Sequence, residues 1–61
     1  MTFTNEEKLT CVQRELKYRR RVYKRRIDMG TMSQELADRE TALMEEIVAD
    51  YQKLASSERL L

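Results

Sequence analysis

The sequence predicts an all-α fold, a two-helix antiparallel hairpin that forms a single domain over residues 1–61. Three observations support this prediction. Apolar residues recur at the spacing of amphipathic helices, the chain contains no proline, and its one glycine, Gly30, divides it into halves of similar length.

A chain of this length has only a small core, which buries about 60% of the surface of the unfolded chain. Cys11 is the only cysteine and histidine is absent, which excludes an intrachain disulfide and a Cys/His zinc site. Of the usual means of stabilising a small domain, oligomerisation remains. We therefore expect the hairpin to dimerise, most simply into a four-helix arrangement.

The first helix is expected over about residues 5–29. Thr4 and Glu7 have the spacing of a capping box, in which each side chain satisfies a free backbone N–H of the first turn. Gly30 is the natural residue to follow the helix, because glycine tolerates the left-handed angles that end many helices.

Residues 30–33 form the predicted loop, and the second helix is expected over about residues 34–57. Ser33 is the expected N-cap, and Thr31 with Gln34 is an alternative capping box. A loop this short makes the two helices antiparallel neighbours.

One apolar stripe on each helix is expected to form the contact between them. The first helix contributes Leu9, Val12, Leu16, Tyr23 and Ile27, and the second contributes Leu36, Leu43, Ile47 and Leu54. Folding the chain about its loop places Ile27 near Leu36 and Leu9 near Leu54.

Both helices carry further apolar residues that this contact does not use. They are Cys11, Tyr18, Val22 and Met29 on the first helix and Met44, Val48, Tyr51 and Ala55 on the second. Scattered apolar residues are normal on protein surfaces, but two unused faces favour self-association, so we predict that these residues form the interface of a homodimer. Cys11 is expected to be a small buried apolar residue there rather than a reactive thiol.

Residues 17–26 carry seven positive charges, although the net charge of the whole chain is only +1. Five basic residues cluster on the side of the first helix away from the contact: Arg14, Lys17, Arg21, Lys24 and Arg25. They are candidates for binding a polyanion, because such strips neutralise the phosphates of nucleic acids. Tyr18 and Tyr23 point elsewhere on the helix, which argues against stacking on bases.

The other basic residues of this segment flank the apolar stripes, and we expect them to be structural. Glu40 lies within the apolar face of the second helix, where a carboxylate is costly unless it is paired. Arg19, Arg20 or the hydroxyl of Tyr23 would be opposite it. The predicted ion-pair network consists of Arg19, Arg20, Arg26, Tyr23 and Glu40.

The composition argues against an enzyme. The chain has no histidine, no base beside its one cysteine and no glycine-rich phosphate loop, so we predict no cofactor, no metal and no small-molecule substrate. No apolar run approaches the roughly 20 residues of a membrane span, and the first residues do not read as a signal peptide. We expect a soluble cytoplasmic protein with no membrane partner.

Several short motifs follow one another along the middle of the chain: Arg19-Arg20-Arg21-Val22-Tyr23, Gly30-Thr31-Met32-Ser33-Gln34, Ala37-Asp38-Arg39-Glu40 and Met44-Glu45. With them the sequence resembles, over about residues 15–51, a group of short uncharacterised helical-hairpin proteins encoded in phage and prophage genomes. The resemblance implies a phage or bacterial origin, hence the cytoplasm of a bacterial host, and implies no particular activity. The group tends to carry proline shortly after the Val-Tyr pair, where this chain has Lys24, so a straighter first helix is expected here.

Our leading hypothesis is a small non-enzymatic interaction or accessory protein of phage or prophage type, which self-associates and binds another macromolecule, with a protein as one candidate partner. One alternative is a nucleic-acid-binding protein that uses the basic residues of the first helix. Another is an inhibitor of a host protein that mimics a helical partner, using the line of Cys11, Tyr18, Val22 and Met29.

Overall fold

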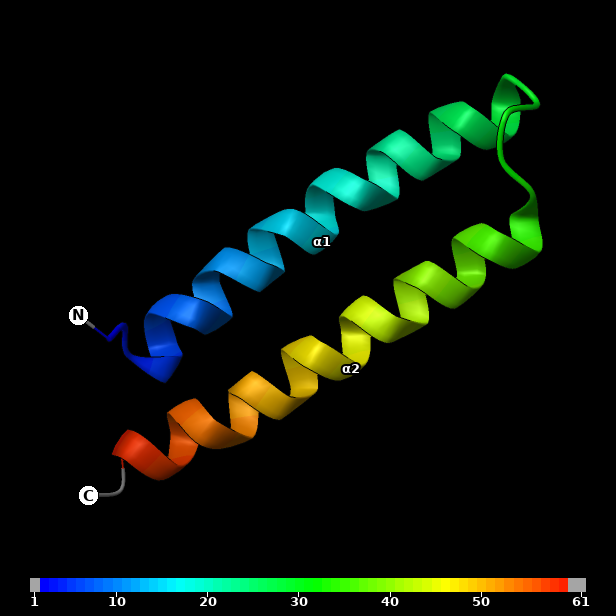
Figure 1. Ribbon diagram of the computed structural model, residues 1–61. Helices are drawn as coiled ribbons and strands as arrows, with labels where there is room; N and C mark the ends of the chain where they lie inside the picture. Colours follow the sequence, from blue (N-terminus) through cyan, green and yellow to red (C-terminus); the bar gives the residue numbers. More distant parts are fainter. Residues whose placement is uncertain (1, 60–61) are drawn as a thin grey trace.

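The computed structural model describes residues 2–59 and contains two helices, α1 (Asn5–Asp28) and α2 (Gln34–Arg59). They lie side by side and antiparallel, so the start of α1 and the end of α2 are at the same end of the molecule (Figure 1). The prediction of an all-α hairpin is confirmed. Within the described residues the molecule is a thin rod with extents of 47 × 19 × 15 Å.

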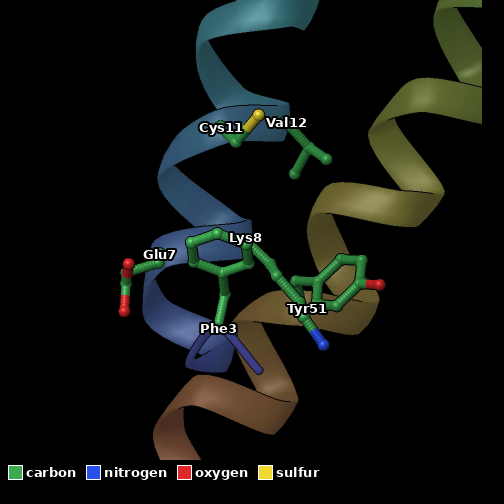
Figure 2. Close-up of a pocket in the computed structure, with 6 residues that line it drawn as sticks. All are labelled: Phe3, Glu7, Lys8, Cys11, Val12 and Tyr51. Atoms are coloured by element: carbon green, nitrogen blue, oxygen red, sulfur yellow. The ribbon is translucent and has the colours of Figure 1, made fainter. Parts of the chain in front are cut away.

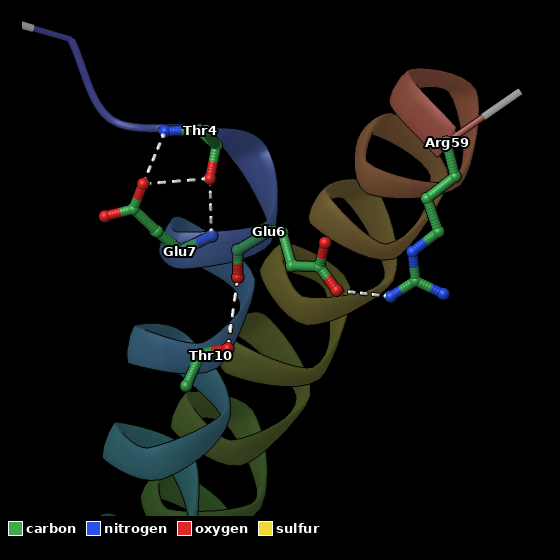
Figure 3. A network of polar contacts seen from close by, with 5 residues as sticks. All are labelled: Thr4, Glu6, Glu7, Thr10 and Arg59. Atoms are coloured by element: carbon green, nitrogen blue, oxygen red, sulfur yellow. Dashed lines mark hydrogen bonds and ion pairs between the residues drawn. The ribbon is translucent and has the colours of Figure 1, made fainter. Parts of the chain in front are cut away.

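The capping box at the start of α1 is present as predicted. The Thr4 hydroxyl accepts a hydrogen bond from the backbone N–H of Glu7 at 3.0 Å. The Glu7 carboxylate in turn accepts from the backbone N–H and the hydroxyl of Thr4 (Figure 3). Glu6 and Glu7 also place negative charge at the positive end of the helix dipole.

A Schellman motif closes α1. The N–H of Thr31 donates to the carbonyl of Arg26, and the N–H of Gly30 donates to the carbonyl of Ile27. Gly30 has the left-handed angle that the motif requires, with φ of 75°. At the start of α2 the Ser33 hydroxyl accepts from the N–H of Leu36, so of the two expected caps it is the serine that forms.

The expected apolar stripe of α1 faces α2. Leu16 is buried and the other four residues of the stripe are half-buried. On α2 the predicted set of residues that contact α1 is wrong, and the observed set is shifted by one position along the sequence. The buried residues are Ala37, Met44 and Ala55, whereas the expected residues Leu36, Leu43, Ile47 and Leu54 are between 39% and 48% exposed.

The physical reason for this difference is a rotation of α2 about its own axis. Each observed contact residue directly follows an expected one, and one residue corresponds to about 100° of rotation. Small side chains such as Ala37 and Ala55 let two helices approach closely, which favours this edge of the apolar surface over the leucines.

The register along the rod agrees with the expected pairing of Leu9 and Leu54. One helical turn toward the chain ends, the Asn5 amide donates to the Glu58 carboxylate at 2.7 Å. Glu6 forms an ion pair with Arg59 beside it (Figure 3). The rotation of α2 therefore changed which side chains face α1 without sliding one helix along the other.

Candidate interaction surfaces of the hairpin

The most conspicuous apolar surface of the hairpin lies on α2. We call it the leucine face, and it consists of Leu36, Leu43, Ile47 and Leu54. It lies about 90° around α2 from the residues buried against α1, at 100° per residue. An exposed row of four large aliphatic side chains along one helix is typical of a surface that contacts another protein.

A second apolar row lies on α1. This α1 apolar line consists of Cys11, Tyr18, Val22 and Met29, as the sequence predicted. Tyr18 is 56% and Met29 69% exposed, and Val22 is half-buried. The thiol of Cys11 is free and the residue is exposed within one chain, so its burial in a dimer interface stays a prediction.

Two of the four α2 residues predicted for the oligomer interface are instead used inside the hairpin. Met44 and Ala55 are buried against α1, and Val48 and Tyr51 are half-buried beside them. Assigning Met44 and Ala55 to an oligomer interface was therefore wrong. The apolar surface that α2 leaves open is the leucine face, which the sequence had assigned to the hairpin contact.

The two broad sides of the hairpin differ in chemistry. On one side, an apolar groove of about 400 Å³ lies near the chain ends and is lined by Phe3, Glu7, Lys8, Cys11, Val12 and Tyr51 (Figure 2). On the helical wheel Tyr51 lies between the α1 contact and the leucine face. A groove shared by Tyr51 and Cys11 therefore places the leucine face and the α1 apolar line on the same broad side.

The opposite broad side carries more charged groups. A second groove of about 340 Å³ runs there near the loop, with Tyr23, Ile27 and Ala37 along it and charged or polar residues from both helices around them: Arg20, Lys24, Asp28, Gln34, Asp38 and Thr41. Arg20 also reaches across the helices to Glu45 on this side, with a distance of 3.6 Å between the charged atoms. Among residues 2–59, the exposed apolar rows of the hairpin thus lie on one of its two broad sides.

The predicted polyanion-binding residues, here called the basic strip, are Arg14, Lys17, Arg21, Lys24 and Arg25. All five are exposed, and none of them forms an ion pair with another residue of the 2–59 segment. Lys24 and Arg25 lie in the last turns of α1, where positive charge also suits the helix dipole.

The predicted ion-pair network around Glu40 is not the one that forms. Glu40 is half-buried and has no ion pair or hydrogen bond to another side chain in the described part of the chain. Arg20 pairs with Glu45 instead, because the rotation of α2 turns Glu45 toward α1. The predicted part played by Glu40 is therefore wrong within a single hairpin, and Arg26 also forms no ion pair there.

Arg19 forms its ion pair within α1. Its guanidinium pairs with Glu15 one turn away at 2.9 Å. Hydrogen bonding of the guanidinium to the Glu15 carboxylate, and then to the Tyr23 hydroxyl oxygen, raises the pKa of Arg19 above its usual range. Arg19 thus neutralises an acidic residue at the edge of the α1 apolar line.

The described residues show no arrangement suited to other chemistry. No cluster of three cysteine, aspartate or glutamate side chains in the 2–59 segment is placed to hold a metal ion. Neither α1 nor α2 contains an apolar stretch long enough to cross a membrane. No protein-family model matches the chain, and neither a curated protein nor a solved structure is significantly similar to it. The two chemically different sides of the hairpin are therefore the features from which we infer a function.

Proposed function

We propose that this chain is a small non-enzymatic interaction protein of phage or prophage type, a helical hairpin that self-associates and presents its remaining surfaces to another macromolecule. The observation that carries the proposal is the leucine face together with the α1 apolar line on the same broad side. Only four of the residues that the structure describes are well buried in this thin rod, so covering this side would add substantially to its stability.

Sedimentation of the purified chain tests the proposal, with a dimer as the expected species. The variant Leu43→Glu places a charge in the leucine face, and we expect it to weaken the dimer by more than about a hundredfold, because burying an unpaired charge costs several kcal/mol. The matched control is Ala42→Glu, which adds the same charge to the exposed opposite side of α2. A native chain that stays monomeric at high concentration would refute self-association.

A second candidate function is binding of nucleic acid by the basic strip. The observation that favours it is that all five residues are exposed and without ion pairs in the described chain. Binding to duplex DNA should then weaken steeply with salt, and the double variant Arg21→Ala/Lys24→Ala should reduce the log–log slope by about 2. If affinity does not change with salt, this function is excluded.

A further inference from the structure

The leucine face and the α1 apolar line repeat the same spacing. Their residues follow one another at intervals of seven, four and seven positions on both helices. This spacing is the same in both chain directions. In an antiparallel pair of helices, each of the four residues of one row can therefore contact one residue of the other row. The contacts would be Met29 with Leu36, Val22 with Leu43, Tyr18 with Ile47, and Cys11 with Leu54.

Within one hairpin these two rows cannot meet. Each helix already uses another face for the contact between α1 and α2, and both rows point to the same broad side. The leucine face lies about 90° from that contact, which is the angle at which a helix of a square four-helix bundle meets its second neighbour. A second copy of the chain, laid face to face on the first, would provide that neighbour.

We infer that the hairpin forms a dimer in which α2 of each chain packs its leucine face on the α1 apolar line of the other. The inference rests on the proposed function and specifies its partner surface. The two-fold axis runs parallel to the helices, so each residue lies level with its copy in the partner. A residue of α1 is then level with the same α2 position in the partner as in its own chain.

The register observed within the chain fits this requirement. Arg20 is level with Glu45, and Glu6 is level with Arg59, as their ion pairs show. The four apolar contacts between chains follow the same pairing. Val22, for example, lies two residues after Arg20, and Leu43 lies two residues before Glu45. No sliding of one hairpin along the other is needed.

A two-fold axis perpendicular to the helices also matches the apolar rows, and charge decides between the two arrangements. That axis places α1 beside α1 of the partner and α2 beside α2 of the partner. The segment of α1 has nine basic and four acidic residues, and that of α2 has three basic and seven acidic residues. Pairing like helices would therefore bring two basic helices together and two acidic helices together.

Individual residues lead to the same choice. In the like-helix arrangement Arg14 lies beside the partner's Arg25, which brings two positive charges together. In the inferred arrangement Arg14 lies beside the partner's Asp50 instead. Arg26, which is unpaired within the described chain, is level with the partner's Glu40. The inferred dimer thus gives Glu40 and Arg26 the partners that the single hairpin does not.

Disulfide trapping between two chains tests the inference. The native chain, whose only cysteine is Cys11, is mixed with the variant Cys11→Ser/Leu54→Cys and treated with a mild oxidant. In a parallel mixture the second chain is Cys11→Ser/Met29→Cys. Because each chain has one cysteine, every disulfide between unlike chains is an intersubunit bond, and peptide mapping identifies it.

In the mixture with Cys11→Ser/Leu54→Cys we expect most of the chains to be joined by a disulfide between unlike chains. In the mixture with Cys11→Ser/Met29→Cys we expect only a background amount of this disulfide. Trapping at position 29 in preference to 54 would show like helices side by side and overturn the inference while leaving self-association intact. Weak trapping at both positions in a chain that sediments as a dimer would also overturn it. Sedimentation of each unoxidised mixture shows whether the variants still associate, and a monomeric native chain would refute the proposed function itself.

Discussion

Gly30 is the residue on which the turn between the helices depends. Its φ of 75° lies in the left-handed region, and a Cβ built on it would contact nothing within 4 Å. Gly30→Ala should therefore destabilise the hairpin by about 1 kcal/mol through backbone strain alone. Urea unfolding followed by circular dichroism measures this change.

Gly30→Asn is the matched control, because asparagine tolerates the left-handed region better than alanine does. It should lose clearly less stability than the alanine variant. Equal losses in the two variants would show that the left-handed angle at this position is not what matters.

Ion pairs at the residue scale should contribute little. Arg20 and Glu45 are both more than half exposed and their charged atoms are 3.6 Å apart. Glu45→Gln is expected to cost less than about 1 kcal/mol, since exposed ion pairs are screened by solvent. A thermal melt at low protein concentration checks this value, and a larger loss would mean that the Arg20–Glu45 contact stabilises the hairpin more than its exposure suggests.

At the scale of the elements, the ends of the helices were more predictable than their faces. Thr4, Glu7, Gly30 and Ser33 act through hydrogen bonds and backbone angles that depend on neighbouring residues, so the sequence contains the whole signal. The face of α2 depends on how closely two helices approach. Periodicity locates the broad apolar surface of α2, but it weights the leucines over Ala37 and Ala55, whose small size allows the close contact.

The candidate surfaces were predictable to a similar extent. The basic strip and the α1 apolar line follow from helical spacing alone, and the structure places both on exposed parts of α1. The sequence alone predicts the leucine face as part of the hairpin contact, because periodicity does not show the rotation of α2 that places the neighbouring residues there instead. Alanines repeating one position after the leucines, at 37 and 55, were the available signal.

The rotation of α2 leads to a prediction about two adjacent residues. Met44 is buried in the hairpin, so Met44→Ala should cost about 2 kcal/mol or more at any protein concentration. Leu43 belongs to the leucine face, so Leu43→Ala should cost little in the monomer and lower stability only at concentrations where the dimer forms. Thermal melts over a range of concentrations separate the two cases, and equal losses in dilute solution would contradict the observed rotation.

At the scale of the whole molecule, the two helices carry opposite charges, and these charges determine which helices attract one another. Each helix would be neutralised on one side by its own partner helix and, in the inferred dimer, on a second side by the other chain. The basic strip faces outward both in the single hairpin and in the inferred dimer, so self-association and binding of a polyanion are compatible. This compatibility favours a protein that uses one side to assemble and another to bind.

The sign of the salt effect on the dimer is the last prediction. Between roughly 10 mM and 150 mM salt the screening length falls from about 30 Å to about 8 Å. If basic α1 lies beside acidic α2 of the partner, screening removes attraction and the dimer should weaken as salt is added. If like helices were neighbours, screening would remove repulsion and the dimer would tighten. Sedimentation of the native chain at several salt concentrations measures the sign, and tightening would contradict the arrangement even if every variant still formed a dimer.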